Sequence, residues 1–108
     1  MTDAMVVLDA LGVPTRRAVL ELLQGGEHTV RELTDAVEVS QPAVSQHLKV
    51  LADAGLVRSR PSGARRLYRI DPDGFAELRV WVDRFWDEAL SEFAAFVDRD
   101  HDDQGETR

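Results

Sequence analysis

The chain opens with two short stretches in which hydrophobic residues recur at the spacing of an α-helix. Met5, Leu8 and Leu11 form the first stretch, and a glycine follows it. The second stretch occupies residues 14–23 and begins with a proline, which suits a first helical turn because its missing N–H would be unpaired there in any case. We therefore expect two helices before the glycine pair at 25–26.

Capping residues predict two further helices joined by a short turn. Thr29 and Glu32 have the spacing of a capping box, in which each side chain binds a free backbone N–H at the helix start. A helix is therefore expected over residues 30–37. Ser40 is a favourable N-cap for the next helix, over residues 41–54, which ends before a glycine.

The remaining pattern predicts a β-hairpin and one long helix. Residues 56–60 and 65–70 have the composition of two strands around a turn at 61–64. Asp71, followed by a proline, caps a last helix that is expected to run to about Val97. The predicted fold is mainly α-helical with a small β-hairpin, in the order of four helices, hairpin and final helix.

The composition is that of one globular domain. A chain of 108 residues has room for a single modest hydrophobic core, and no apolar run is long enough to span a bilayer. Cysteine is absent and the chain does not begin with a secretory leader, so we expect a cytoplasmic protein without disulfides. We assign residues 1–97 to one domain, and 98–108 to an acidic, disordered tail.

The sign of the charge reverses along the chain. The net charge is −7, yet residues 40–70 carry +5, whereas residues 1–39 carry −4 and residues 71–108 carry −8. A basic segment between acidic flanks suits a protein that presents one face to phosphates. We call its six cations the basic island: Lys49, Arg58, Arg60, Arg65, Arg66 and Arg69.

The helix expected over 41–54 has the character of a DNA-recognition helix. Its hydrophobic residues lie on one side, and the other side presents small polar groups. A major groove admits one α-helix, and glutamine can bind adenine through two hydrogen bonds. From these residues we expect base contacts from Gln41, Ser45 and Gln46.

The segment SQPAVSQHLKVLADAGLV at 40–57 resembles the helix-turn-helix of the ArsR/SmtB repressors, and PTRRAVLELL at 14–23 resembles their second helix. The resemblance covers residues 5–97. It implies a winged helix-turn-helix repressor that binds an inverted-repeat operator as a homodimer, with residues 56–70 as the wing. It also adds Pro42 to the groove-facing residues. The expected phosphate contacts are Ser40, His47, Lys49, Arg60, Arg65 and Arg66.

The aromatic residues are concentrated at one end of the chain and predict a dimer. Every Phe and Trp lies in the expected last helix, which is more apolar surface than one side of a helix normally buries. A soluble monomer generally avoids so large an exposed patch. We therefore expect a two-fold interface that contains Met5, Leu8, Trp81, Phe85, Trp86, Leu90 and Phe93.

The chain departs from the family pattern at several positions. Metal-sensing members carry cysteine in the third helix, and others place histidine in the last helix, but neither residue is present there. No metal or other cofactor is therefore expected. Val13 and Glu38 stand where the family often has a capping Asp and a turn Gly. A weak divalent-cation site remains an alternative at His101 with Asp98, Asp100, Asp102 and Asp103.

The sequence also bears on functions other than DNA binding. An enzyme would need a nucleophile with its base, paired carboxylates in a cleft or a phosphate-binding glycine loop, and none is evident. A winged-helix protein–protein interaction module remains an alternative, as does a metal or small-molecule sensor of the same fold. His28 is expected in a loop.

Overall fold

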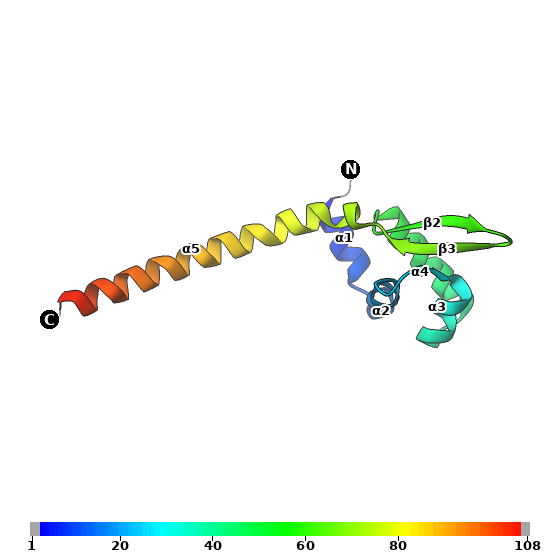
Figure 1. The fold of residues 1–108 in the computed structure, drawn as a ribbon, viewed down its shortest axis with the longest axis horizontal. Coiled ribbons are helices and arrows are strands. Elements are labelled where there is room, and N and C mark those ends of the chain that lie inside the picture. Colours follow the sequence, from blue (N-terminus) through cyan, green and yellow to red (C-terminus); the bar gives the residue numbers. More distant parts are fainter. Residues whose placement is uncertain (1–2, 107–108) are drawn as a thin grey trace. The chain divides into compact units, whose positions relative to one another are not determined.

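The predicted helices and hairpin follow one another in the expected order, with a short strand and a 3₁₀ turn added (Figure 1). The computed structural model describes the backbone of residues 3–106 and the side chains of residues 3–99. Residues up to Leu78 form one compact unit, and those from Arg79 form a second. The elements are α1 (Ala4–Leu11), α2 (Pro14–Leu23), β1 (His28–Thr29), α3 (Val30–Val37), α4 (Gln41–Asp53), β2 (Val57–Ser62), β3 (Arg65–Ile70), the 3₁₀ turn η1 (Pro72–Phe75) and α5 (Ala76–Glu106).

The helix starts follow the predicted caps. The Thr29 hydroxyl accepts a hydrogen bond from the backbone N–H of Glu32 at 3.2 Å, and the Glu32 carboxylate accepts one from the N–H of Thr29 at 2.9 Å. This confirms the capping box of α3. Ser40 caps α4 through the N–H of Ala43. Val13 makes no side-chain hydrogen bond at the start of α2, as expected for an apolar cap residue.

The turn between α3 and α4 requires an unusual backbone conformation. Glu38 ends α3 in the left-handed region, with φ of 57° and ψ of 35°. Side chains other than glycine adopt this region at some cost. Glu38, which stands where the family often has a glycine, therefore adopts a conformation that favours glycine, and the turn directs the chain into α4.

The core lies within the first unit, where α2, α3 and α4 pack together with α1 and the start of β2. Its largest fully buried side chains are four leucines and three valines, all from these helices except Leu56, which directly precedes β2: Leu33, Leu48, Leu51, Leu56, Val7, Val19 and Val44. Tyr68 and Ile70 of β3 and Phe75 of η1 pack against this cluster. The core therefore fixes one side of α4 and the inner side of the hairpin.

The sheet has three strands instead of the two that the sequence predicted. β1 pairs with β3 through His28 and Tyr68, which gives the antiparallel order β1-β3-β2. The prediction of a loop at His28 was wrong, because a strand of two residues leaves no periodicity to detect. Strand β2 also runs on to Ser62, and Gly63 turns the chain with φ of 63°. The hairpin extends past α3 and α4 (Figure 1).

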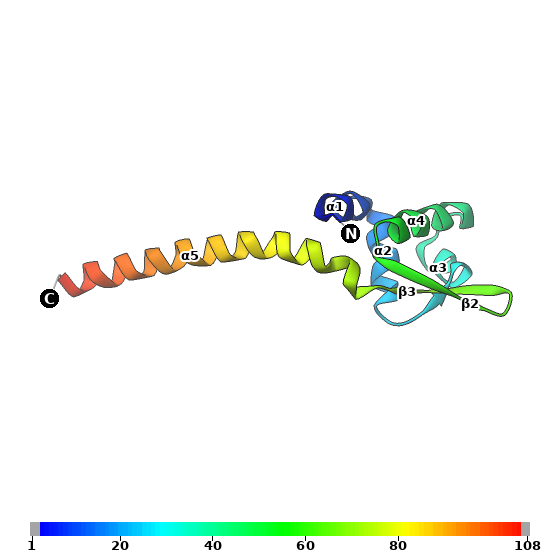
Figure 2. The same cartoon turned by 90° about the horizontal axis from the view of Figure 1, so that it is seen from above.

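Helix α5 differs from its prediction at both ends. Asp71 caps η1 and not an α-helix, and α5 begins only at Ala76. It continues past the predicted end near Val97 to Glu106, as one gently curved helix (Figure 2). Residues 98–104 contain no proline or glycine, so nothing local ends the helix there. Residues 107–108 of the predicted disordered tail lie outside the described part.

Gly74 is needed where η1 approaches the turn after α4. A Cβ atom at this position would overlap the backbone carbonyl of Gly55, and backbone cannot move aside cheaply. We expect Gly74→Ala to lower the free energy of unfolding by about 3 kcal/mol. Chemical denaturation measures this loss. Gly25→Ala is the control, because a Cβ there would meet only ordinary contacts; equal losses in the two variants would contradict the prediction.

Candidate nucleic-acid interface

Helix α4 separates its apolar and polar residues as the sequence predicts. Val44, Leu48 and Leu51 are buried in the core. The four residues expected to face the groove are all exposed: Gln41, Pro42, Ser45 and Gln46. The helix therefore presents amide and hydroxyl groups on a side that no other described element covers, while contacts between these groups and bases stay a prediction.

His47 lies at the edge of this polar side and is half-buried. Its Nδ1 accepts a hydrogen bond from Nε of Arg16 at 3.3 Å, and a guanidinium nitrogen of Arg16 also donates to the carbonyl of Ala10. The Arg16 side chain therefore connects α4 to α2 and to the end of α1. The phosphate contact expected of His47 stays a prediction, and it would use Nε2, the ring nitrogen that this link leaves free.

Three cations of the basic island are paired with carboxylates. Lys49 Nζ lies 2.9 Å from Asp53, and Arg58 Nε lies 2.8 Å from Asp71. Arg60 donates two hydrogen bonds to Glu27, at 2.8 and 3.1 Å. These pairs are exposed or partly exposed, so they contribute little to stability. They do reduce the positive charge that the wing offers to an anion.

The ion pair between Arg60 and Glu27 also shifts the pKa values of both side chains. The hydrogen bonds from Arg60 lower the pKa of Glu27, and the same bonds raise the pKa of Arg60. Glu27 therefore stays ionised opposite the wing. The sequence did not predict this pair, because the two residues are far apart in the chain and meet only through the β1–β3–β2 sheet.

The other three cations of the basic island lie on β3. Among the described residues, no carboxylate forms an ion pair with Arg65, Arg66 or Arg69. Arg66 Nε donates to the Ser59 hydroxyl at 3.1 Å, which holds its side chain along the hairpin. Arg65 and Arg66 were predicted as phosphate contacts, and their position beside the hairpin tip leaves them exposed.

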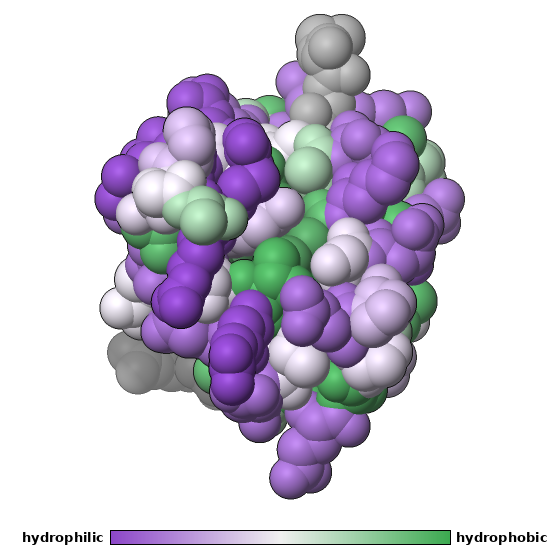
Figure 3. Space-filling model, turned by 90° about the vertical axis from the view of Figure 1, so that its right-hand side faces the viewer, coloured by the Kyte–Doolittle hydropathy of each residue, from purple (hydrophilic) through white to green (hydrophobic). Residues whose placement is uncertain are grey.

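A hollow of about 370 Å³ lies between the hairpin tip and the first turns of α3 and α4. Its lining includes Arg65 and Arg66 from the wing, Gln41 from α4, and Arg31 from α3. Seen from the hairpin end, strongly hydrophilic side chains surround a hollow with an apolar floor (Figure 3). The sequence prediction missed Arg31, because only the folded chain brings this residue to the wing.

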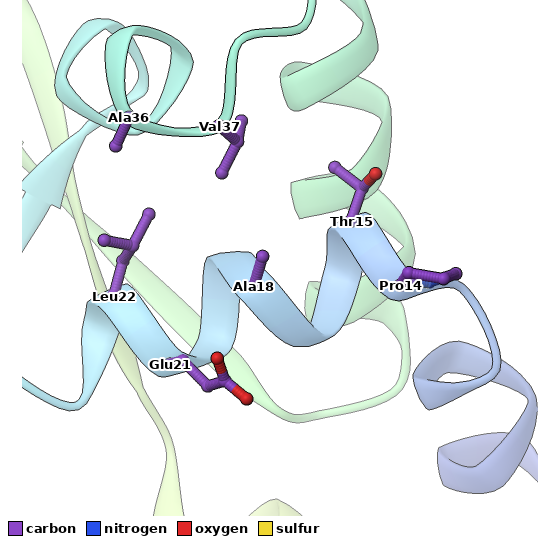
Figure 4. Close-up of a pocket in the computed structure, with 7 residues that line it drawn as sticks. All are labelled: Pro14, Thr15, Ala18, Glu21, Leu22, Ala36 and Val37. Atoms are coloured by element: carbon purple, nitrogen blue, oxygen red, sulfur yellow. The ribbon is translucent and has the colours of Figure 1, made fainter.

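A larger hollow lies between α2 and α3 and is mostly apolar (Figure 4). Leu22 of α2 and Val37 of α3 point toward one another across it, and the carboxylate of Glu21 is turned away from α3. Its volume is about 510 Å³. No charged group points into this groove, so the polar side of α4 and the wing remain the better candidate site.

Helix α5 carries a row of exposed hydrophobic side chains. Phe85, Trp86, Leu90 and Phe93 are between 56% and 64% exposed. The rings of Trp81 and Phe85 meet edge to face, with centroids 4.8 Å apart. In α1, Met5 is also exposed and Leu8 is half-buried. The exposure that a dimer interface requires is therefore present, while the interface itself stays a prediction.

The described residues contain no group of three or more His, Cys, Asp or Glu side chains that could hold a metal ion. The weak site considered at His101 involves side chains after Arg99, which lie outside the described part. Within residues 3–106, no helix combines the length and apolar character that a membrane span requires.

Comparison with known proteins agrees with this geometry. Residues 13–59 match the model of the bacterial regulatory proteins of the arsR family. The chain is 52% identical over 94 residues to the HTH-type transcriptional regulator Rv2034 of Mycobacterium tuberculosis, covering 87% of this chain and 88% of that protein. It is 47% identical over 72 residues to the repressor SmtB of the same species, which is 67% of this chain and about half (53%) of that protein.

A solved structure shows the same architecture. The homodimeric winged helix-turn-helix DNA-binding domain of Mb0332 from Mycobacterium bovis, determined by NMR, is 33% identical to the chain. The match covers 82% of each chain with a TM-score of 0.63. This likeness confirms the predicted winged helix-turn-helix fold, including the hairpin as its wing.

Proposed function

The chain belongs to the arsR family of bacterial regulatory proteins, and on this basis we propose that it is a sequence-specific DNA-binding transcription regulator. It acts as a dimeric repressor on an inverted-repeat operator in the cytoplasm, and not as an enzyme. One observation carries the proposal: the exposed polar residues Gln41, Ser45 and Gln46 of α4 stand beside a wing with three cations that form no ion pair with a described carboxylate.

Helix α4 is the reading element in this proposal. Its buried leucines and valine hold it on the core, and the Arg16–His47 hydrogen bond fixes its orientation relative to α2. The amides of Gln41 and Gln46 can each bind adenine through two hydrogen bonds, and Ser45 can donate or accept at a base edge. Because the helix is held on the core, these groups reach the major groove without a loss of backbone entropy on binding.

The wing and the dimer position α4 on the DNA. Arg65 and Arg66 bind phosphate oxygens, which fixes the register of α4 on the duplex without reading sequence. Two copies related by a two-fold axis would place their α4 helices about 34 Å apart, one turn of DNA, and so match an inverted repeat. In this assignment residues 1–97 contain both the DNA-binding and the dimerisation surfaces.

Base-reading and phosphate-binding residues are expected to respond differently to substitution. Gln46→Ala and Ser45→Ala should each weaken binding to the preferred sequence by about 1–3 kcal/mol while leaving random DNA almost unaffected. Arg65→Ala should weaken both DNAs alike, because phosphates carry no sequence information. Competitive titrations of one operator fragment and one random fragment measure both effects.

The control for these variants is Gln24→Ala, an exposed glutamine after α2 that is outside the proposed interface. It should leave both affinities unchanged. If Gln46→Ala and Arg65→Ala reduce the two affinities in the same ratio, α4 does not read the bases. A chain that binds neither fragment would favour the alternative of a protein–protein interaction module.

A further inference from the structure

The hollow between the wing and the first turns of α3 and α4 concentrates positive charge from two distant parts of the chain. Arg31 lies in the first turn of α3, whereas Arg65 and Arg66 follow the hairpin tip. The described residues that line this hollow include no carboxylate. Among the described residues, none of the three arginines forms an ion pair, in contrast to Lys49, Arg58 and Arg60 of the island.

The chemistry of the lining fits a phosphate group. Guanidinium groups present planar pairs of N–H donors that match two oxygens of a phosphate, and bonds between charged groups are stronger than neutral ones. The hollow adds neutral hydrogen-bonding groups from Gln41 and Tyr68. Three cations without a counter-ion repel one another, and a bound anion would remove this repulsion. A volume of about 370 Å³ also leaves room for the group that carries the phosphate.

We propose that Arg31, Arg65 and Arg66 together form a phosphate-binding site. Two sources can supply the phosphate. One is a backbone phosphate of the operator, next to the bases that α4 reads, and this source depends on the proposed function. The other is the phosphate of a small phosphorylated molecule. Because both use the same guanidinium groups, the small molecule would compete with DNA and so release the protein from its operator.

Position within the sheet supplies a matched control. Arg69 lies on the same strand as Arg65 and Arg66, but it is not among the residues that line the hollow. Arg69→Gln removes one positive charge from β3, as a substitution of Arg65 or Arg66 would, but it leaves the hollow intact. Arg31→Gln tests the site itself. Arg31 is exposed, so both variants should fold, which circular dichroism and thermal unfolding would verify.

The first arm of the experiment uses a DNA fragment that the full chain binds, with single phosphates replaced by uncharged methylphosphonates. Replacement of the phosphate in the hollow should weaken wild-type binding about tenfold. The same replacement should have almost no effect on Arg31→Gln, because the partner of that phosphate is already lost. Arg69→Gln should keep the wild-type response.

The second arm uses inorganic phosphate and adenosine monophosphate as probes, followed by calorimetry and by competition with labelled DNA. Saturable binding that Arg31→Gln reduces about tenfold and Arg69→Gln preserves would identify a small-molecule phosphate site. If only the first arm depends on Arg31, the hollow binds a phosphate of the DNA backbone and no small molecule.

The two proposals fail in distinguishable ways. If the chain binds DNA with base preference but neither arm depends on Arg31, the phosphate site is wrong and the regulator function stands. If the chain binds no DNA but holds the small probes through Arg31, the regulator function is wrong and the phosphate site stands.

Discussion

The affinity of the chain for DNA is expected to fall about a thousandfold as salt rises from about 50 to 200 mM. Each phosphate that a protein cation neutralises releases counter-ions, which gives a slope of about −0.9 per phosphate in a plot of log affinity against log salt. Three island cations in each chain carry no carboxylate partner. A dimer that uses them all should therefore show a slope of about −5.

Fluorescence anisotropy titrations at several salt concentrations measure this slope directly. A value of about −11 would mean that all six island cations of each chain bind phosphate and that the internal ion pairs break on DNA. A flat plot would contradict binding through the wing. The slope therefore reports how many of the island cations bind phosphate. The number of cations in the sequence does not give this information.

Glu27→Gln provides a specific test of the internal pairs. The variant releases Arg60 from its carboxylate partner, so the slope should become steeper by about 0.9 for each chain of the dimer. Glu21→Gln is the control, since it removes the same charge from an exposed residue that forms no ion pair in the described part. Equal slopes in the two variants would show that Arg60 does not bind phosphate.

The local features of the fold could be predicted from the sequence. A capping box joins residues three apart, so Thr29 and Glu32 predict the start of α3 from the sequence alone. The apolar side of α4 likewise follows from helical periodicity. The end of α5 was predicted wrongly because polar composition was taken as a helix end, although no residue there breaks a helix.

The long-range features of the site could not be predicted in the same way. Arg60 meets Glu27, and Arg31 reaches the hollow beside Arg66, only after β1 adds to the hairpin. A strand of two residues has no hydrophobic pattern, so its pairing is decided by tertiary structure. The cations of the basic island can therefore be identified from the sequence, whereas the fold decides which of them are free to bind an anion.

Substituting Trp86 and Leu90 with glutamate is expected to convert the dimer into monomers and to weaken operator binding about a hundredfold or more. The two side chains are 61% and 57% exposed on α5, among further exposed aromatic residues. Aromatic residues in an interface centre often contribute most of its binding energy, and two new carboxylates there would have to be desolvated. A monomer also loses the second half-site, which a dimer binds at high effective concentration.

The opposite side of the same helix supplies the control. Val80 and Ser91 project about half a turn away from the aromatic row, and both are exposed. Val80→Glu with Ser91→Glu adds the same two charges to α5 without touching the proposed interface, so this variant should remain a dimer with undiminished operator affinity. Light scattering at micromolar concentration and a DNA titration compare the two double variants. A wild-type monomer would overturn the dimer, and a monomeric Trp86/Leu90 variant with full operator affinity would show that one copy of α4 and its wing suffices.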